Sequence, residues 1–306
     1  MTQLVQPLFD GPVDIIGDIH GEIDALENLL GHLGYSEHGV HPDGRRLVFV
    51  GDLTDRGPDS PTVVEIVKSF VEAGRAQCVM GNHEFNILLG QRKHDNHWFF
   101  GEEWSLDYTD EPTPAKLADD TIRTSVTDFF KSLPLALERD DVRVVHACWD
   151  DSMVDKARDS KDAEALHDEH RKQIYIAHEK SNLDEIGRGL EHQNRNPVKV
   201  ITSGKEERVE IPFEASGKLR YEDRIHWWHD YDEKRICVFG HYSFFKGEFN
   251  SPGRAICNDF AVAKRWIERQ AADFDGTFRT KLAGLRIPEM TWVFDDGKSE
   301  SLEFRE

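Results

Sequence analysis

The sequence predicts an α/β fold with a largely parallel sheet and helices packed on its faces. Short apolar runs that could form buried strands alternate with stretches whose apolar residues recur at helical spacing, and glycines stand at several junctions. This alternation of strand and helix favours parallel pairing, because each helix carries the chain back across the sheet.

The alternating elements occupy the first part of the chain. Leu26, Leu29 and Leu33 recur at helical spacing, and Gly34 suits the end of that helix. In chain order we predict strands at residues 13–17, 46–51 and 77–80, with helices at residues 22–33 and 61–73 between them. Two later apolar runs repeat the pattern of a strand followed by a polar loop, at residues 143–147 and 235–240.

Two segments interrupt this pattern. Residues 150–196 are charged, rich in histidine and poor in long apolar runs, with helical spacing around residues 163–177. They lack the glycine, serine and proline bias of a linker. We therefore expect an insertion that, with the chain up to residue 224, forms a cap over the active site. A smaller insertion is expected at residues 91–118, within one domain that spans residues 1–306.

The charge balance argues against several classes of partner. Lysine and arginine number 38 and aspartate and glutamate 58, so the formal net charge is −20. A field of this sign repels a phosphate backbone, so broad nucleic-acid binding is not expected; a small phosphorylated substrate remains compatible, because metal ions can reverse the sign locally. No run is apolar enough to span a membrane, and residues 1–12 lack the features of a signal peptide. A cytoplasmic protein without membrane contact is expected.

Polar residues of similar chemistry follow each predicted strand. They are Asp18 and His20 after the first, Asp52 after the second, Asn82 after the third, and His146 and His241 at the two later strands. Loops at the carboxyl ends of parallel strands meet over one crevice, so these side chains are expected to converge from distant parts of the chain.

Such a cluster requires cations. Buried carboxylates and several polar donors brought together would repel one another or stay unsatisfied unless something binds between them. Mixed histidine, aspartate and asparagine ligation suits borderline divalent ions such as Mn²⁺, Fe²⁺ or Zn²⁺, of which Mn²⁺ is the one expected here. Six ligands are too many for one catalytic ion but suit two divalent ions roughly 3.5–4 Å apart that share one carboxylate. Asp52 is the expected bridge.

Three motifs carry a family resemblance: Gly-Asp-Ile-His-Gly at residues 17–21, Gly-Asp-Leu-Thr-Asp-Arg-Gly at 51–57 and Gly-Asn-His-Glu at 81–84. Together they resemble the calcineurin-like metallophosphoesterases, in the phosphoprotein-phosphatase branch. Within that branch the chain looks most like bacterial PrpE-type phosphatases and dinucleoside tetraphosphate hydrolases, and like the phosphatase module of bacterial polynucleotide kinase-phosphatase.

The resemblance implies a central β-sandwich flanked by helices rather than a single open sheet. It also implies a role for each matching residue: Asp18, His20 and Asp52 would bind one metal, and Asp52, Asn82, His146 and His241 the other; His83 would be the general acid, oriented by Asp55, and Arg56 would clamp the phosphate. Arg224 lies where similar enzymes carry a second phosphate-binding arginine, although a surface arginine is an alternative. Asp259 falls where relatives place a strand aspartate, with structural hydrogen bonding or support of the metal ligands as its alternatives.

The expected activity is hydrolysis of phosphomonoesters by attack of a metal-bridging hydroxide. The first expected substrate is a phosphorylated protein, with serine/threonine or tyrosine left open. The alternatives are a dinucleoside polyphosphate of the Ap4A type, an RNA-end or 2′,3′-cyclic nucleotide phosphate, and a non-catalytic binding module. Five further histidines are expected to be solvated rather than to form another metal site: His94, His97, His167, His170 and His178.

Overall fold

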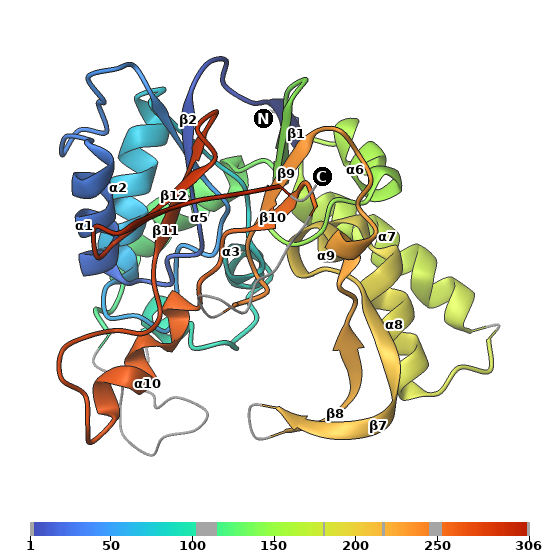
Figure 1. Ribbon diagram of the computed structural model, residues 1–306. Coiled ribbons are helices and arrows are strands. Elements are labelled where there is room, and N and C mark those ends of the chain that lie inside the picture. Colours follow the sequence, from blue (N-terminus) through green and yellow to red (C-terminus); the bar gives the residue numbers. More distant parts are fainter. Residues whose placement is uncertain (1–2, 102–114, 180, 216–217, 245–252, 305–306) are drawn as a thin grey trace.

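Two β-sheets packed against each other form the centre of the molecule, with helices on their outer faces (Figure 1). The structure is a computed structural model that describes residues 3–101, 115–179, 181–215, 218–244 and 253–304. The predicted insertion at residues 91–118 therefore lies partly outside the described residues. None of the described helices has the length and apolarity needed to cross a membrane.

The six-stranded sheet contains the strands predicted in the first part of the chain. Its order is β13 (Ser299–Ser301), β12 (Thr291–Phe294), β11 (Ala283–Ile287), β2 (Val13–Ile16), β3 (Arg46–Phe49) and β4 (Ala76–Cys78). β2, β3 and β4 are parallel, as predicted, while β11 pairs antiparallel with β2. The connecting helices α1 (Ile23–Leu33) and α2 (Ser60–Glu72) match the predicted helices within a residue or two.

The five-stranded sheet combines strands from both halves of the chain. Its order is β1 (Val5–Pro7), β5 (Ala136–Glu138), β6 (Val142–Val145), β9 (Ile236–Phe239) and β10 (Ala255–Cys257). β6 and β9 are the two later strands predicted from the sequence, and they pair in parallel.

Apolar side chains from the two sheets meet in one core. Val13 and Ile15 of β2 pack in the same buried cluster as Val144 of β6 and Val238 of β9, whereas Ile16 belongs to the cluster that includes the helix residues. Successive side chains of one strand are thus buried on opposite faces of the sheet, as expected when both faces are covered. The β-sandwich implied by the resemblance is confirmed, and the single parallel sheet expected from the local pattern alone is wrong.

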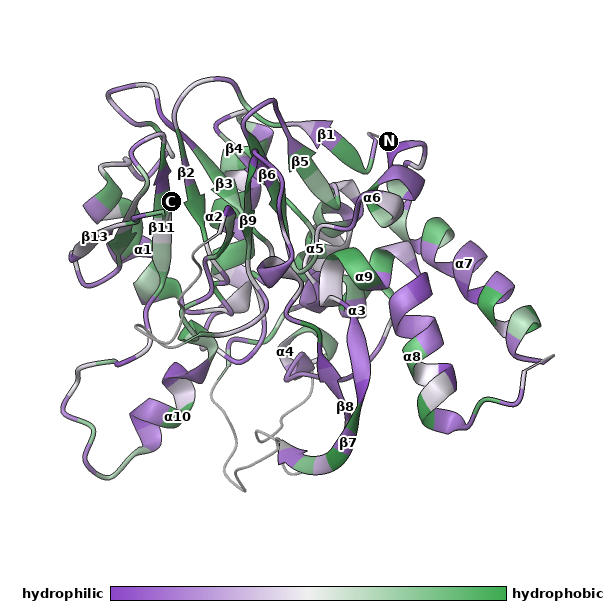
Figure 2. Cartoon of the chain, turned by 45° about the vertical axis from the view of Figure 1, so that its right-hand side comes forward, coloured by the Kyte–Doolittle hydropathy of each residue, from purple (hydrophilic) through white to green (hydrophobic). Residues whose placement is uncertain are grey.

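Between β6 and β9 the chain leaves the sandwich. It forms α6 (Asp151–Arg158), α7 (Ala163–His178), α8 (Glu185–Arg195), α9 (Pro197–Ser203) and an antiparallel pair, β7 (Glu206–Ala215) and β8 (Lys218–Arg224). Figure 2 shows largely green strands in the two sheets and long purple stretches on α7 and α8. The predicted helix at residues 163–177 is α7.

The remaining elements connect these parts. They are α3 (Asn82–Leu88), α4 (His97–Phe100), α5 (Asp120–Ser132), η1 (Trp227–His229), η2 (Val262–Lys264) and α10 (Arg265–Gln270). α3 starts directly after β4, so its first residues lie at the sheet edge where the predicted metal ligands are expected.

Candidate metal centre

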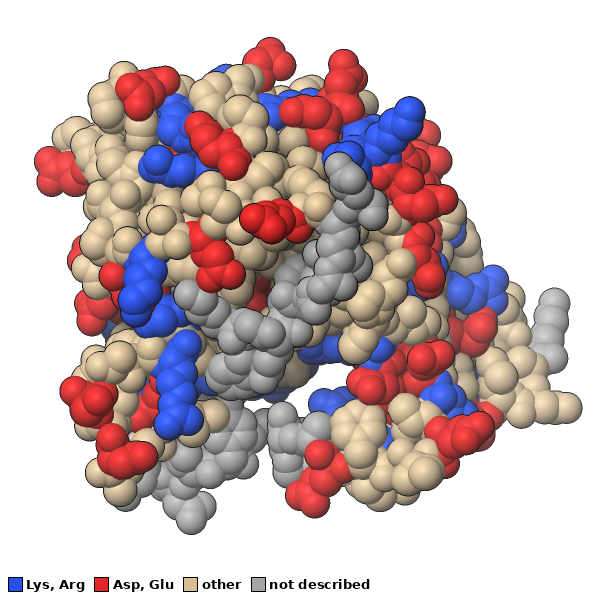
Figure 3. Space-filling model, in the orientation of Figure 1, with Lys and Arg blue, Asp and Glu red and all other residues tan. Residues whose placement is uncertain are grey.

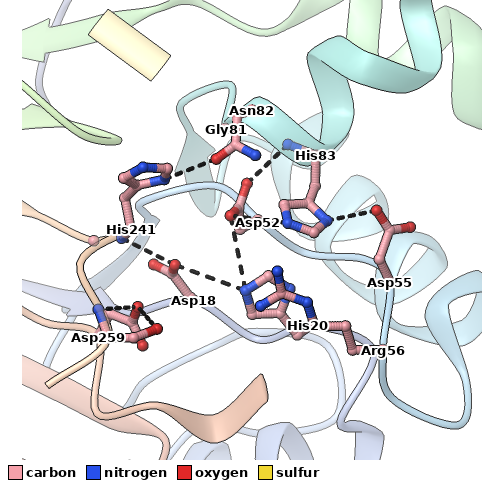
Figure 4. A network of polar contacts seen from close by, with 12 residues as sticks. Asp18, His20, Asp52, Asp55, Arg56, Gly81, Asn82, His83, His241 and Asp259 are labelled. Carbon is pink, nitrogen blue, oxygen red and sulfur yellow. Dashed lines mark hydrogen bonds and ion pairs between the residues drawn. The ribbon is translucent and has the colours of Figure 1, made fainter. Parts of the chain in front are cut away.

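The six predicted ligands lie together at the carboxyl ends of strands from both sheets. Figure 4 labels all of them except His146. Asp18 and His20 follow β2, Asp52 follows β3, and Asn82 begins α3; His146 follows β6 and His241 follows β9. The parallel strands of each sheet deliver their following loops to the same edge, and the packing of the sheets brings the two edges together.

Asp52 stands at the centre of the cluster. Its Oδ2 lies 3.3 Å from Nε2 of His146, 3.7 Å from Nε2 of His20 and 3.8 Å from Nε2 of His83. Two groups of candidate ligand atoms share this carboxylate, one with His20 and His83 and the other with His146 and His241. Asp52 therefore lies where a bridging ligand is expected. His83, which is expected to be the general acid, lies close to His20 and Asp52 in the first group.

Asn82 and His241 complete the second group. Oδ1 of Asn82 lies 2.8 Å from Nδ1 of His241 and 3.3 Å from Nε2 of His146. An amide oxygen and two imidazole nitrogens that face one another are a donor set for a borderline divalent cation.

Asp18 has a buried carboxylate oxygen that a bound cation would satisfy. It is buried, its Oδ2 accepts a hydrogen bond from the backbone N–H of His241 at 3.0 Å, and its Oδ1 has no partner among the described residues. Burial, with the nearby charges of Asp259 and Asp52, raises the pKa of Asp18 well above its ordinary value. A buried carboxylate with a free oxygen beside a second carboxylate fits a metal ligand, because a cation would satisfy both.

Backbone carbonyls orient two of the imidazoles. The Nδ1 atom of His20 lies 3.0 Å from the carbonyl of Thr54, and that of His146 lies 2.8 Å from the carbonyl of Val50. Each Nδ1 donates its proton there, so Nε2 is the nitrogen that faces Asp52 and that would bind a metal ion. For His146 this would require loss of the proton that Nε2 carries beside Asp52.

Burial and neighbouring charges shift the pKa values of several residues in the cluster. Burial lowers the pKa of His20 and of His241 well below the usual range, so both rings are neutral at pH 7, as ligands must be. Although burial opposes it, the charge of Asp52 raises the pKa of His146 to about 10, and the charge of His146 in turn holds the pKa of Asp52 well below its usual value. When only protein groups are considered, the protonated ring of His146 supplies the positive charge that balances the carboxylate of Asp52.

The backbone around the centre is strained. His20, Asp52, Asp55, Arg56 and His241 all have φ between 48° and 75°, a region that side chains other than glycine rarely adopt. Neighbouring glycines allow this close packing: a Cβ atom on Gly81 would stand 2.5 Å from the backbone nitrogen of Asp52.

Glu84 ties two of the loops together. Its carboxylate accepts hydrogen bonds from the backbone N–H groups of Asp52, Leu53 and Gly81, each at 2.9 Å. The same buried side chain therefore sets the position of Asp52 after β3 and the start of α3 after β4. Sequence reasoning assigned Glu84 no role, although its place at the end of the Gly-Asn-His-Glu motif was a usable signal.

A chain of buried polar contacts orients His83. Nδ1 of His83 lies 2.5 Å from Oδ2 of Asp55, and Oδ1 of Asp55 accepts a hydrogen bond from the indole N–H of Trp98 at 2.6 Å. Figure 4 shows His83 between Asp52 and Asp55. The pairing of His83 with Asp55 expected from the resemblance is present, and Trp98 is a third member that sequence reasoning missed.

A pocket of about 210 Å³, the central pocket, opens beside the cluster. Its cationic residues are Arg56, Lys93, Lys199, Arg220 and Arg224, and its carboxylates among the described residues are Asp52 and Glu206. Arg224 donates a hydrogen bond to the carbonyl of His241 at 3.1 Å, which places it at the site rather than on a remote surface. Figure 3 shows Lys and Arg atoms at the inner edge of the opening beside β7–β8.

Asp259 and the extra histidines can also be placed. Both carboxylate oxygens of Asp259 accept hydrogen bonds, from Ser243 and from the backbone N–H of Ala261, so its contacts are structural, and its charge reaches Asp18. His167 is buried, so the expectation that it is solvated is wrong; it packs edge-on against Phe85.

Residues 11–269 match the family model of the calcineurin-like phosphoesterases. The chain belongs to this family. Members of this family use a dinuclear centre of divalent metal ions.

Curated relatives of this calcineurin-like phosphoesterase are named as asymmetrical bis(5′-nucleosyl)-tetraphosphatases, PrpE. The protein from Geobacillus sp. strain WCH70 is 39% identical over 141 residues, which cover 44% of this chain and 56% of the relative. The protein from Bacillus subtilis strain 168 is 51% identical over 73 residues, which cover 23% of this chain and 30% of the relative. The chain thus spans about half the length, or less, of the curated relatives it matches.

Solved structures support the fold over almost the whole chain. A cold-active protein-tyrosine phosphatase from a psychrophilic Shewanella species aligns with a TM-score of 0.56 and 18% identity, covering 99% of this chain and 83% of that one. A serine/threonine phosphatase from Saccharomyces cerevisiae aligns with a TM-score of 0.51 and 14% identity, covering 93% and 76%. At these identities the likeness concerns the fold alone.

Proposed function

We propose that this phosphoesterase hydrolyses dinucleoside tetraphosphates asymmetrically, to a nucleoside triphosphate and a nucleoside monophosphate. The observation that carries the proposal is the excess of positive charge in the central pocket of a chain whose net charge is −20. Five cationic side chains line it, more than one phosphoryl group requires, and a polyphosphate bridge would engage several of them at once. The names of the PrpE relatives support the same substrate class.

The sequence alone favours a phosphorylated protein as the first substrate and a dinucleoside polyphosphate as the alternative. The curated relatives support the alternative better. A phosphoprotein would bring only one phosphate to the small central pocket. Most of the five cationic side chains that line the pocket would then have no phosphoryl group to bind.

We propose that the predicted ligands hold two divalent ions. Asp18, His20 and Asp52 would hold one, and Asp52, Asn82, His146 and His241 the other, with Mn²⁺ the preferred ion. When bound, such ions lower the pKa of a water molecule toward neutrality and neutralise charge on phosphoryl oxygens.

The remaining site residues would bind the substrate and move a proton. Arg56 and Arg224 both line the central pocket, where the planar guanidinium of Arg56 suits two phosphoryl oxygens and Arg224 would provide a second contact to the phosphate. Nε2 of His83 would donate a proton to the leaving oxygen, while Asp55 holds the other ring nitrogen at 2.5 Å and stabilises the imidazolium form.

The test is a comparison of kcat/KM across substrates with manganese-loaded protein. The panel contains a dinucleoside tetraphosphate, p-nitrophenyl phosphate, phosphoserine and phosphotyrosine peptides, and a 2′,3′-cyclic nucleotide. We expect the dinucleoside tetraphosphate to be hydrolysed with the highest kcat/KM and to yield a triphosphate and a monophosphate. A higher kcat/KM for a phosphopeptide, or two diphosphate products, would contradict the proposal.

A matched pair of variants ties the activity to the centre. Asp52→Asn keeps the size of the side chain but removes the charge shared by both ligand groups, so activity should be lost in every assay. Asp24→Asn, on the exposed side of α1, should keep wild-type activity. The non-catalytic alternative would be supported if the metal-loaded wild type hydrolysed none of the phosphoesters.

A further inference from the structure

Two lysines stand where the central pocket meets a second cavity. This cavity, the distal pocket, has a volume of about 680 Å³ and lies between α3, α7, α8 and α9. The two pockets share four lining residues, Asn86, Lys93, Gln193 and Lys199. The shared wall makes the distal pocket the natural continuation of the central pocket, away from the metal cluster.

The ammonium groups of Lys93 and Lys199 lie near each other without a carboxylate partner among the described residues. Neither ammonium group has a hydrogen bond or ion pair with any residue that the structure describes, although the chain carries an excess of carboxylates. Glu206 is the carboxylate whose charge reaches Lys199, without pairing with it. Burial and the neighbouring charge of Lys199 lower the pKa of Lys93 to about 8, so the two ammonium groups repel each other. Such a pair is costly unless an anion binds between them.

The walls of the distal pocket combine charged side chains, Glu164, Asp168 and Arg171, with aromatic rings. Phe85 packs edge-on against His167 with ring centroids 5.2 Å apart, and His167 against His192 at 5.6 Å. Tyr175 also lines the pocket and keeps 61% of its surface exposed. Phe85 and His167 are buried, so Tyr175 is the ring whose exposed surface a nucleobase could stack on.

We propose that Lys93 and Lys199 bind the phosphates of a polyphosphate substrate beyond the one that is attacked, and that the distal pocket receives the nucleoside attached to them. This inference rests on the proposed function and deepens it. It assigns the segment from α7 to α9 the recognition of the far end of the substrate, while Arg56 and Arg224 serve the reacting phosphoryl group.

The test is equilibrium binding rather than turnover, so that it does not depend on the proposed activity. The probes are inorganic orthophosphate and a non-hydrolysable imido analogue of tripolyphosphate, titrated calorimetrically into manganese-loaded protein at a fixed free concentration of Mn²⁺. We expect the analogue to bind at least tenfold more tightly than orthophosphate. Lys93→Gln and Lys199→Gln should each reduce this ratio by fivefold or more.

Two controls separate charge from folding. Lys93→Arg and Lys199→Arg keep the positive charge and should keep the ratio. Lys161→Gln removes an exposed lysine that lines neither pocket and should also leave the ratio unchanged. A wild-type ratio near one, or a ratio that Lys93→Gln and Lys199→Gln do not change, would overturn the inference.

A separate binding experiment tests whether the distal pocket receives the nucleoside. ATP with an imido bridge should bind more tightly than the imido tripolyphosphate, and Tyr175→Ala together with His192→Ala should remove that difference. If the two probes bind equally to the wild type, the distal pocket holds phosphate only and the nucleoside part is wrong. If dinucleoside tetraphosphate is not hydrolysed but the phosphate ratio holds, the proposed function fails while the lysine site stands.

Discussion

At the scale of single residues, His83 provides the sharpest test of the proposed chemistry. Replacing it by asparagine removes the proton donor but keeps a polar side chain. We expect kcat for phenyl phosphate to fall by about 10²–10⁴-fold, and kcat for p-nitrophenyl phosphate to fall much less, because the nitrophenolate leaves without a proton.

Asp55→Asn is the companion variant. It keeps the acceptor for Trp98 but weakens the stabilisation of the imidazolium, so the same leaving-group dependence should appear with a smaller amplitude. An equal loss for both substrates in His83→Asn would show that His83 acts in another way, such as through the metal ligands beside it.

The charge of Lys93 predicts how binding of the imido tripolyphosphate depends on pH. Its pKa is lowered to about 8 by burial and by Lys199, so Lys93 is charged below that pH and loses its charge as the pH rises through it. Binding of the imido tripolyphosphate should therefore weaken between pH 7 and pH 9.

The comparison that isolates this effect is Lys93→Arg, since arginine stays charged over the whole range. The variant shares every other titrating group near the site, including Lys199 and His94, and it shares the ionisation of the probe. The ratio of wild-type to variant affinity should fall above pH 8. A constant ratio would remove Lys93 from the binding of the phosphates.

At the scale of elements, the start of α9 links stability to the distal pocket. Asn196 is fully buried; its side chain accepts hydrogen bonds from the backbone N–H groups of Val198 and Lys199 and donates one to the carbonyl of His167. Asn196→Ala should lower the free energy of unfolding by about 1–2 kcal/mol, because a helix cap is lost and buried groups lose partners. Urea unfolding measures the change.

The matched control is Asp184→Ala at the start of α8. Asp184 also caps a helix, through the N–H of Gly187, but it is exposed and does not contact Lys199. Both variants should be destabilised, and only Asn196→Ala should also weaken binding of the imido tripolyphosphate. Weakening of similar size in both would assign the effect to general loosening of the helices.

The elements show which parts of the molecule the sequence could predict. β2, β3, β4, β6 and β9 are short apolar runs that end in conspicuous polar residues, so local pattern alone located both the strands and the six residues that now lie together. The predicted ligands come together because the strand, and not the distant partner, sets where each side chain emerges.

The rest depends on contacts that local pattern does not encode. β1 is three residues long and pairs with β5 from far along the chain, so the second sheet could be expected only from the family resemblance. β7 and β8 carry many charged residues and bulge between Arg208 and Phe213, which hid them within the expected insertion. Lys93 and Lys199 follow no strand, and only tertiary packing brings them to one wall.

At the scale of the whole molecule, metal binding should couple to stability. Ligands that bind only the folded state stabilise it by RT ln(1 + [L]/Kd), about 2.7 kcal/mol for each site at a hundredfold excess over Kd. For a chain of this size two such sites correspond to a rise of about 5–10 °C in Tm on addition of Mn²⁺. EDTA should reverse the rise.

Asp52→Asn again provides the contrast. Because Asp52 belongs to both groups of ligand atoms, the variant should lose most of the rise, whereas Asp24→Asn should retain it. Differential scanning calorimetry with and without Mn²⁺ measures both. A rise of the same size in Asp52→Asn would place the stabilising ions elsewhere on the molecule.

The distribution of the ligands along the chain also has a consequence for biosynthesis. His241 donates its backbone N–H to Asp18 across 223 residues of sequence, and the two come from different sheets. Most of the polypeptide must therefore emerge from the ribosome before Asp18 and His241 can lie side by side. If the centre holds two ions as proposed, the nascent chain cannot bind both with the full set of ligands until the two sheets have packed together.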